Sequence, residues 1–305
     1  MTGPCDWPDD WRARLDRPLP RDHGADDLRR AWDAALPPPD PVDRWTGQHL
    51  RFASGKQAEG VILTPARPTG CAVLMFHDHG GRFDVGWRKC TDDPQGFYGG
   101  SPARRLLAAG HPVMCFDTVG WGGRQMAGDQ QALACAAFGL GTSLAGLVAG
   151  EDRDIATWAA TRPEAARGLA VWGFSFGGFR AWQCLATTPV VQAAVGFSWM
   201  ARWRDLLRAG APITAGQSAF WMLHPSLMAR ADLPDLAGAG APKPLFLRSG
   251  SADRHLPRPA AAAAFDDLRR IWGGGLDAAI FPGGHVCPPQ MQAEAIAFLR
   301  RAGLS

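Results

Sequence analysis

The sequence has little excess charge and no long apolar run. Its 305 residues include 32 basic and 29 acidic side chains, which gives a formal net charge of +3. So small an excess does not indicate nucleic acid or an anionic membrane as a partner. No segment approaches the roughly 20 apolar residues of a membrane-spanning helix. The first residues also lack the apolar stretch of a signal peptide.

Cysteine pairing and a phosphate-binding loop are missing as well. The seven cysteines are scattered, with no C-x-x-C pair and no zinc-finger spacing. Because their number is odd and several lie in apolar runs, a reducing compartment fits best, and we expect a cytoplasmic protein. The Gly-rich tract at 117–124 does not have the G-x-x-x-x-G-K-[ST] pattern that holds phosphate.

Apolar residues are plentiful by contrast. They make up 46% of the chain, and there are 13 tryptophans against one tyrosine. A chain of this length and composition can bury a sizeable core, as one large domain or two small ones. Most of the tryptophans are expected in that core.

From about residue 48, short apolar runs alternate with helical segments. The runs at 71–76 and 168–174 are uninterrupted, as is typical of parallel strands buried on both faces. Further strands are predicted at 60–65, 111–117, 190–198, 244–250 and 278–281, and helices at 101–109, at 150–162, directly after 175 and at 290–302. This alternation predicts a mostly parallel central sheet with helices on both faces.

Two segments do not follow this alternation. Residues 1–47 are predicted to form an N-terminal arm with one helix over Asp26–Leu36, which the following prolines end. Residues 48–305 form the main domain, and within it the Trp- and Met-rich stretch 199–240 is predicted to be a cap-like insertion. The same apolar stretch would also suit an interface between copies of the chain, so the oligomeric state stays open.

The strongest local motif is Gly173-Phe174-Ser175-Phe176-Gly177-Gly178. It lies where a predicted strand meets a helix, which is the context of a nucleophile elbow. The turn at such an elbow is so sharp that side chains two positions either side of the serine would collide. The motif therefore predicts Ser175 as a nucleophile at a helix N-terminus.

A serine nucleophile needs a base and an orienting carboxylate, in the chain order serine, acid, histidine. His285 follows the last predicted strand and precedes the final helix, so it is the predicted base. His255 and His224 are poorer candidates. Asp253 directly follows the strand at 244–250 and is the predicted acid, with Asp205 as the alternative.

An oxyanion hole needs two backbone N–H groups, one of them from the residue after the nucleophile. That residue is Phe176, and the second amide is expected from His79, with Gly80 as the near alternative. A metallo-β-lactamase-like site would continue with a further aspartate and histidine almost at once, whereas GGRFD follows here, so we expect no metal at His77-Asp78-His79. Four further side chains are predicted to border the substrate pocket: Trp121, Arg124, Trp199 and Trp221.

With these motifs the chain resembles the α/β-hydrolase superfamily, especially its bacterial dienelactone-hydrolase-like and acetyl-xylan-esterase-like branch. The matching stretches are FHDHGGRFDVGWRK, FDTVGWGGR, EDRDIATWAATRPE, VWGFSFGG, DLPDLAGAGAPKPLFLRSGSADRHLP and FPGGH. The resemblance implies cleavage of a small-molecule carboxylic ester through an acyl-enzyme, without a cofactor.

Two positions depart from that branch. Asp78 stands where the branch usually has glycine in an H-G-x-G-G loop, and Ser175 replaces the cysteine of dienelactone hydrolases proper. The serine favours a general esterase. The same triad could also cleave a lactone, a thioester or a peptide, or transfer an acyl group. A catalytically silent scaffold that binds a small ligand is the alternative from another class.

Overall fold

The computed structural model describes residues 9–126, 129–209 and 211–304. Its strands are β1 Val42–Trp45, β2 His49–Phe52, β3 Gln57–Leu63, β4 Ala72–Phe76, β5 Val113–Phe116, β6 Leu169–Phe174, β7 Ala193–Phe197, β8 Leu245–Gly250 and β9 Leu276–Phe281. Its α-helices are α1 Asp9–Asp16, α2 Ala25–Ala35, α3 Arg88–Asp92, α4 Pro102–Ala108, α5 Gln130–Gly139, α6 Leu144–Ala159, α7 Phe176–Thr187, α8 Trp203–Ala209, α9 Pro212–Ala215, α10 Pro225–Met228, α11 Leu233–Ala237, α12 Arg258–Trp272 and α13 Pro289–Arg301. Short 3-10 helices are η1 Gly122–Arg124, η2 Pro163–Ala165, η3 Gln217–Met222 and η4 Gly238–Gly240.

All nine strands form one sheet in the order β1-β2-β3-β5-β4-β6-β7-β8-β9. The strands from β5 to β9 in this order run parallel to one another, and β1, β2 and β3 are joined by antiparallel pairing. Parallel strands present their carboxyl ends at one edge, so the loops after β4, β6, β7 and β8 meet there. The predicted mostly parallel sheet is confirmed.

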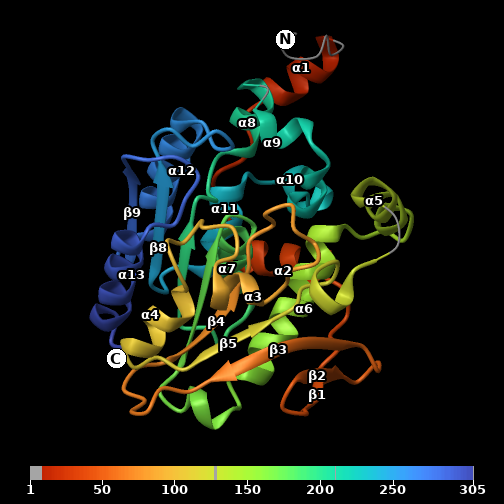
Figure 1. The fold of residues 1–305 in the computed structure, drawn as a ribbon. Coiled ribbons are helices and arrows are strands. Elements are labelled where there is room, and N and C mark those ends of the chain that lie inside the picture. The colour runs from red at the N-terminus through yellow and green to blue at the C-terminus, as the bar shows by residue number, and fades with distance from the viewer. Residues whose placement is uncertain (1–8, 127–128, 210, 305) are drawn as a thin grey trace.

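Side chains alternate between the two faces of the sheet, and each face has its own core. In β4, Leu74 and Phe76 join the cluster covered by α2, α6, α7, α11 and α12, whereas Val73 and Met75 join the cluster covered by α4 and α13. Figure 1 shows the sheet between these two sets of helices. Burial on both faces explains why the central strands are apolar throughout.

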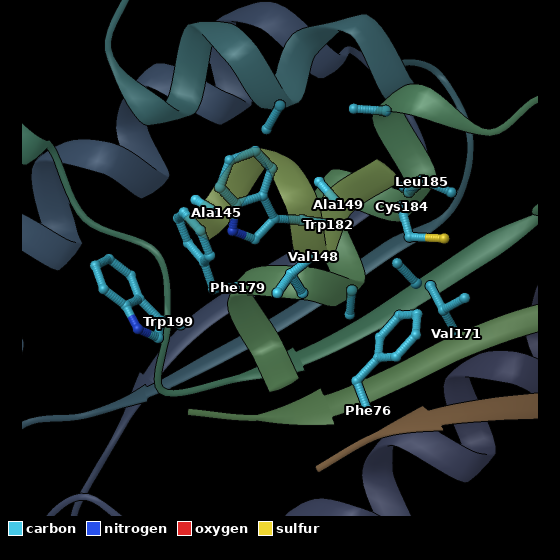
Figure 2. Packing of buried hydrophobic residues seen from close by; sticks show 14 of the residues in the cluster. Phe76, Ala145, Val148, Ala149, Val171, Phe179, Trp182, Cys184, Leu185 and Trp199 are labelled. Atoms are coloured by element: carbon cyan, nitrogen blue, oxygen red, sulfur yellow. The ribbon is translucent and has the colours of Figure 1, made fainter. Parts of the chain in front are cut away.

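Helix α7 is the central element of the larger core. Figure 2 shows its side chains Phe179 and Trp182 beside Val148 of α6, with Phe76 of β4 below them. The rings of Phe179 and Trp182 meet edge to face, with centroids 5.2 Å apart. Because α7 begins directly after Ser175, this packing fixes the position of the nucleophile.

The N-terminal segment is tied to this core. Trp32 of α2 is 1% exposed, its ring meets that of Trp182, and its indole N–H donates to the carbonyl of Leu236 at 3.1 Å. Strand β1 falls within the predicted arm, residues 1–47, yet it pairs with β2 and so extends the central sheet. A boundary at residue 47 therefore divides a β-hairpin.

Replacing Trp32 by alanine is expected to lower the free energy of unfolding by about 3–5 kcal/mol, because a large buried ring and its cavity are involved. Chemical denaturation monitored by far-UV circular dichroism measures this change. Leu140→Ala is the comparison, because Leu140 is 84% exposed. Equal stability of the two variants would show that α2 is not part of the cooperative core.

Within the described ranges, no single helix is long and apolar enough to cross a membrane, although the bent pair α5–α6 meets that test jointly. The six cysteines in these ranges are free. The cytoplasmic location stays a prediction.

Candidate active site

The loop between β6 and α7 is a tight turn built on glycine. Ser175 has φ 56° and ψ −123°, a backbone conformation that residues other than glycine rarely adopt. A Cβ added to Gly173 would lie 2.1 Å from the backbone of Gly177, and one added to Gly177 would lie 2.0 Å from the carbonyl oxygen of Phe76. Only glycine fits at either position, so the structure explains the G-x-S-x-G spacing.

The structure brings Ser175, His285 and Asp253 into one hydrogen-bonded row. The Ser175 Oγ lies 2.8 Å from His285 Nε2, and His285 Nδ1 lies 2.8 Å from Asp253 Oδ2. Since a carboxylate only accepts, Nδ1 carries the proton and Nε2 is free to accept from the serine hydroxyl. This tautomer is the one a general base requires.

Asp253 is anchored by its own loop after β8. Its Oδ1 accepts the backbone N–H of His255 at 2.8 Å and that of Leu256 at 3.1 Å. Burial alone would raise the pKa of the Asp253 carboxyl. The hydrogen bond from His285 and these two amides outweigh that effect and hold the pKa below its ordinary value. The carboxylate therefore stays ionised beside the imidazole.

The alternative base and acid candidates lie elsewhere or have other partners. Asp205 is on α8 and pairs with Arg208 at 3.0 Å. The buried His224 shares a hydrogen bond with Gln183. His255 packs its ring against that of His285, with centroids 4.6 Å apart, and burial lowers the pKa of His255 to about 4. His255 therefore forms part of the wall around the row.

A pocket of about 530 Å³ opens over Ser175 and His285. The loop after β4 forms one side of it through Asp78, His79, Gly80 and Gly81. The predicted cap-like segment forms another through Trp199, Ile213, Ser218 and Met222, and Arg254, His255 and Leu256 lie along the loop that also holds Asp253. A pocket of this size suits a small organic molecule.

Of the four side chains predicted to border the pocket, only Trp199 does so. Trp121 is fully buried and stacks on Phe176, with ring centroids 5.5 Å apart. Trp221 packs against Trp121 and borders a separate cavity. Arg124 pairs with Glu151 of α6 and donates to the carbonyl of Asp117. The prediction was wrong for these three because their partners hold them beneath or beside the site.

Two backbone amides of the loop that follows β4 have no acceptor among the described residues. Neither His79 nor Gly80 donates its N–H to any residue that the structure describes, and the same holds for Phe176 at the start of α7. His79 and Gly80 line the pocket. Unpaired N–H groups beside a nucleophile are the arrangement that an oxyanion hole requires.

Both histidines of the His77-Asp78-His79 stretch have their ring nitrogens occupied. His77 lies with Nδ1 2.9 Å from the carbonyl oxygen of Asp78 and accepts the amide of Thr118 at Nε2. His79 donates from Nε2 to Gln130 and accepts the amide of Gly81 at Nδ1, and burial lowers its pKa to about 4. Among the described residues, no group of three or more histidine, cysteine, aspartate or glutamate side chains could hold a metal ion.

One residue beside the site could not be predicted from the sequence. Lys89 of α3 is 1% exposed and donates to the carbonyls of the loop that follows β4. No pattern of neighbouring residues distinguishes such a lysine from a solvated one.

No protein-family model and no curated protein sequence matches the chain. Several solved structures do resemble it. A proposed acetyl xylan esterase from Bacteroides fragilis has a TM-score of 0.67 and 17% identity, over 89% of this chain and 81% of the other. Acetyl xylan esterase 1 from Thermoanaerobacterium has a TM-score of 0.59 and 16% identity, over 95% and 98%. An esterase from Pyrococcus furiosus has a TM-score of 0.59 and 17% identity, over 87% and 99%.

The chain has the α/β-hydrolase fold, which confirms the resemblance in the sequence at the level of the fold. Acetyl xylan esterases are among the solved structures that share it, as the narrower resemblance predicts. At 16–17% identity the likeness extends to the fold alone.

Proposed function

We propose that the protein is a serine hydrolase that cleaves a carboxylic ester through an acyl-enzyme intermediate. The observation that carries the proposal is the hydrogen-bonded row Ser175–His285–Asp253 at the floor of a pocket. Several solved structures of the same fold are named esterases, which supports the same class of reaction.

In the first half of the reaction, the Ser175 Oγ attacks the ester carbonyl carbon while its proton passes to His285 Nε2. The carbonyl oxygen becomes an oxyanion, which the amides of Phe176 and of His79 or Gly80 stabilise. One such donor typically contributes about 3–4 kcal/mol. When the C–O bond to the alcohol breaks, the imidazolium donates its proton to that oxygen, and the acyl group stays on Ser175.

In the second half, His285 takes a proton from a water molecule, and the hydroxide attacks the acyl carbon. The tetrahedral intermediate collapses as the imidazolium returns a proton to Ser175 Oγ, which releases the carboxylic acid. Asp253 holds the imidazole tautomer and stabilises the imidazolium in both halves. The reaction is balanced with water alone.

The pocket walls support a small, partly apolar substrate. Phe97, Phe174 and Met222 present apolar surface, while Arg254 and Ser218 present polar groups. A cavity of about 530 Å³ holds a small-molecule ester.

Labelling with a fluorophosphonate probe tests the proposal, because the probe reacts only with an activated serine. We expect a single covalent adduct, which mass spectrometry of the digested protein locates on Ser175. The wild-type protein should hydrolyse p-nitrophenyl esters in a series from acetate to decanoate, and the chain length with the highest kcat/KM measures the size of the acyl pocket. Absence of both labelling and ester hydrolysis by the wild-type protein would contradict the proposal and would favour a ligand-binding scaffold.

A further inference from the structure

A buried ammonium group lies under the loop that follows β4. Lys89 of α3 is 1% exposed, and its Nζ donates to the carbonyl oxygens of His79 at 2.7 Å and Asp78 at 3.1 Å. Burying an ammonium group costs several kcal/mol unless partners compensate for its lost hydration. The Lys89 ammonium is therefore stable in this position only because of the groups around it.

The surroundings of Lys89 compensate its charge only in part. The Asp78 carboxylate lies 3.9 Å away, and its other oxygen accepts the hydroxyl of Tyr98 at 2.8 Å. The ammonium also lies over the ring of Trp121, 5.8 Å from the centroid. The shortest contact that Lys89 makes is nevertheless to a peptide carbonyl, that of His79.

Each of these two carbonyls is held by a second donor. His77 Nδ1 lies 2.9 Å from the Asp78 oxygen, and the Trp121 indole N–H donates to the His79 oxygen at 3.2 Å. The single cis peptide bond among the described residues is Ala241–Pro242, so the two peptides of this loop are trans. In a trans peptide the N–H points opposite to the C=O. The amides of His79 and Gly80 therefore point away from Lys89.

The pocket borders this loop and does not border Lys89. Its lining includes Asp78, His79 and Gly80. The loop thus separates the ammonium from the pocket. With both carbonyl oxygens fixed on the buried side, neither peptide can rotate without breaking two hydrogen bonds. A positive charge at the carbonyl end of a peptide also strengthens the attraction of its N–H end for an anion.

We infer that Lys89 is a positioning residue for the oxyanion hole: it directs the amides of His79 and Gly80 at the oxygen that becomes negative during acylation. The inference rests on the proposed function and assigns a further residue to the same site. Lys89 does not touch the substrate. Its effect should fall on the transition state, where the oxyanion exists, and little on substrate binding.

Lys89→Met tests this inference, because methionine keeps an unbranched chain of similar length and removes the ammonium. We expect kcat for a p-nitrophenyl ester to fall about 10- to 100-fold, somewhat less than the loss of a direct oxyanion donor, while KM changes less than about threefold. The rate of fluorophosphonate labelling should fall in parallel, because that reaction also develops charge on the oxygen that the amides face.

Lys243→Met is the matched control. The Lys243 ammonium also donates to backbone carbonyls, those of Leu185, Thr188 and Pro189, but at the end of α7 far from Ser175. This variant should lose stability without losing kcat. Thermal unfolding of both variants separates the two effects. An equal loss of kcat in both variants, or none in Lys89→Met, would overturn the inference.

The pH profile of the wild type gives a second measurement that needs no variant. Burial lowers the pKa of Lys89 to about 8, against the opposing charge of Asp78. The other titratable or charged groups around it are His77, His79, Tyr98, Cys90, Asp84 and Arg82. We expect kcat/KM to decline as pH rises through about 8, and in Lys89→Arg the decline should move to higher pH.

Stability should not follow this decline. Because the pKa of Lys89 is lower in the folded state than its ordinary value, losing that proton favours the folded state as pH rises. A kcat/KM that stays flat up to pH 10 would overturn the inference even if Lys89→Met does not fold. A wild type that neither reacts with the probe nor cleaves esters would overturn the proposed function itself, and the inference with it.

Discussion

Replacing Ser175 by alanine is expected to reduce kcat/KM for ester hydrolysis by about 10⁴- to 10⁶-fold. The Oγ is the atom that forms the acyl-enzyme, and it lies 2.8 Å from its base, His285 Nε2. Among the residues that the structure describes, no second hydroxyl takes part in the row of hydrogen bonds with Asp253. Steady-state hydrolysis of p-nitrophenyl acetate measures the loss, and the fluorophosphonate adduct should disappear with it.

The fold should survive this change. Ser175 already has φ 56°, and alanine at that φ carries a similar strain, so the sharp turn costs both residues about the same. The thermal midpoint should therefore stay close to that of the wild type. Ser54→Ala, in the exposed turn before β3, controls for loss of a hydroxyl elsewhere. Hydrolysis that persists in the purified Ser175→Ala protein would exclude this serine as the nucleophile.

The central part of the fold could be predicted because burial on both faces leaves a clear pattern. Strands β4 and β6 are apolar at every position, and each is followed by a turn that contains glycine. The hairpin of β1 and β2 could not be predicted. Its strands, VDRW and HLRF, are four residues each, mix polar with apolar side chains, and depend on pairing at the edge of the sheet.

The start of helix α6 could not be predicted from local sequence, because it depends on a contact with a distant segment. The sequence pattern predicts that this helix begins at residue 150, but it begins at Leu144, with Ser143 accepting the amide of Gly146 as an N-cap. Glycine usually weakens a helix interior. Here, however, a Cβ on Gly150 would lie 2.6 Å from Pro37, so the glycine admits the segment that follows α2. The contact that favours glycine at this position is with Pro37, which is distant in the sequence, so a local pattern does not reveal it.

For the site, too, one part could be predicted from the sequence and another could not. The order serine, acid, histidine can be read from the sequence because each of the three follows a strand whose carboxyl end lies at one edge of the sheet. The pocket walls could not be read in this way. Trp121 and Trp199 are both tryptophans in loops after strands, yet one lies beneath Phe176 and the other faces the pocket. Only the packed structure separates a core ring from a pocket ring.

Asparagine in place of Asp253 is expected to lower kcat about 10⁴-fold while leaving the shape of the site intact. The reason lies in the two oxygens of Asp253. Oδ1 accepts the amides of His255 and Leu256, so the carbonyl oxygen of asparagine should take that place. Its NH₂ group then faces His285 Nδ1, which must accept. The proton moves to Nε2, and the imidazole can no longer accept the proton of Ser175.

The comparison of Asp253 with Asp205 separates this effect from a general loss of charge. Asp205 is a partly exposed aspartate on α8 whose partners are arginines, and it lies outside the pocket, so Asp205→Asn should keep kcat within about twofold. Both variants should still react with a fluorophosphonate, Asp253→Asn far more slowly than Asp205→Asn. If Asp253→Asn kept its activity and Asp205→Asn lost it, the acid of the triad would be Asp205, and His285 would have to leave the position in which Asp253 now holds it.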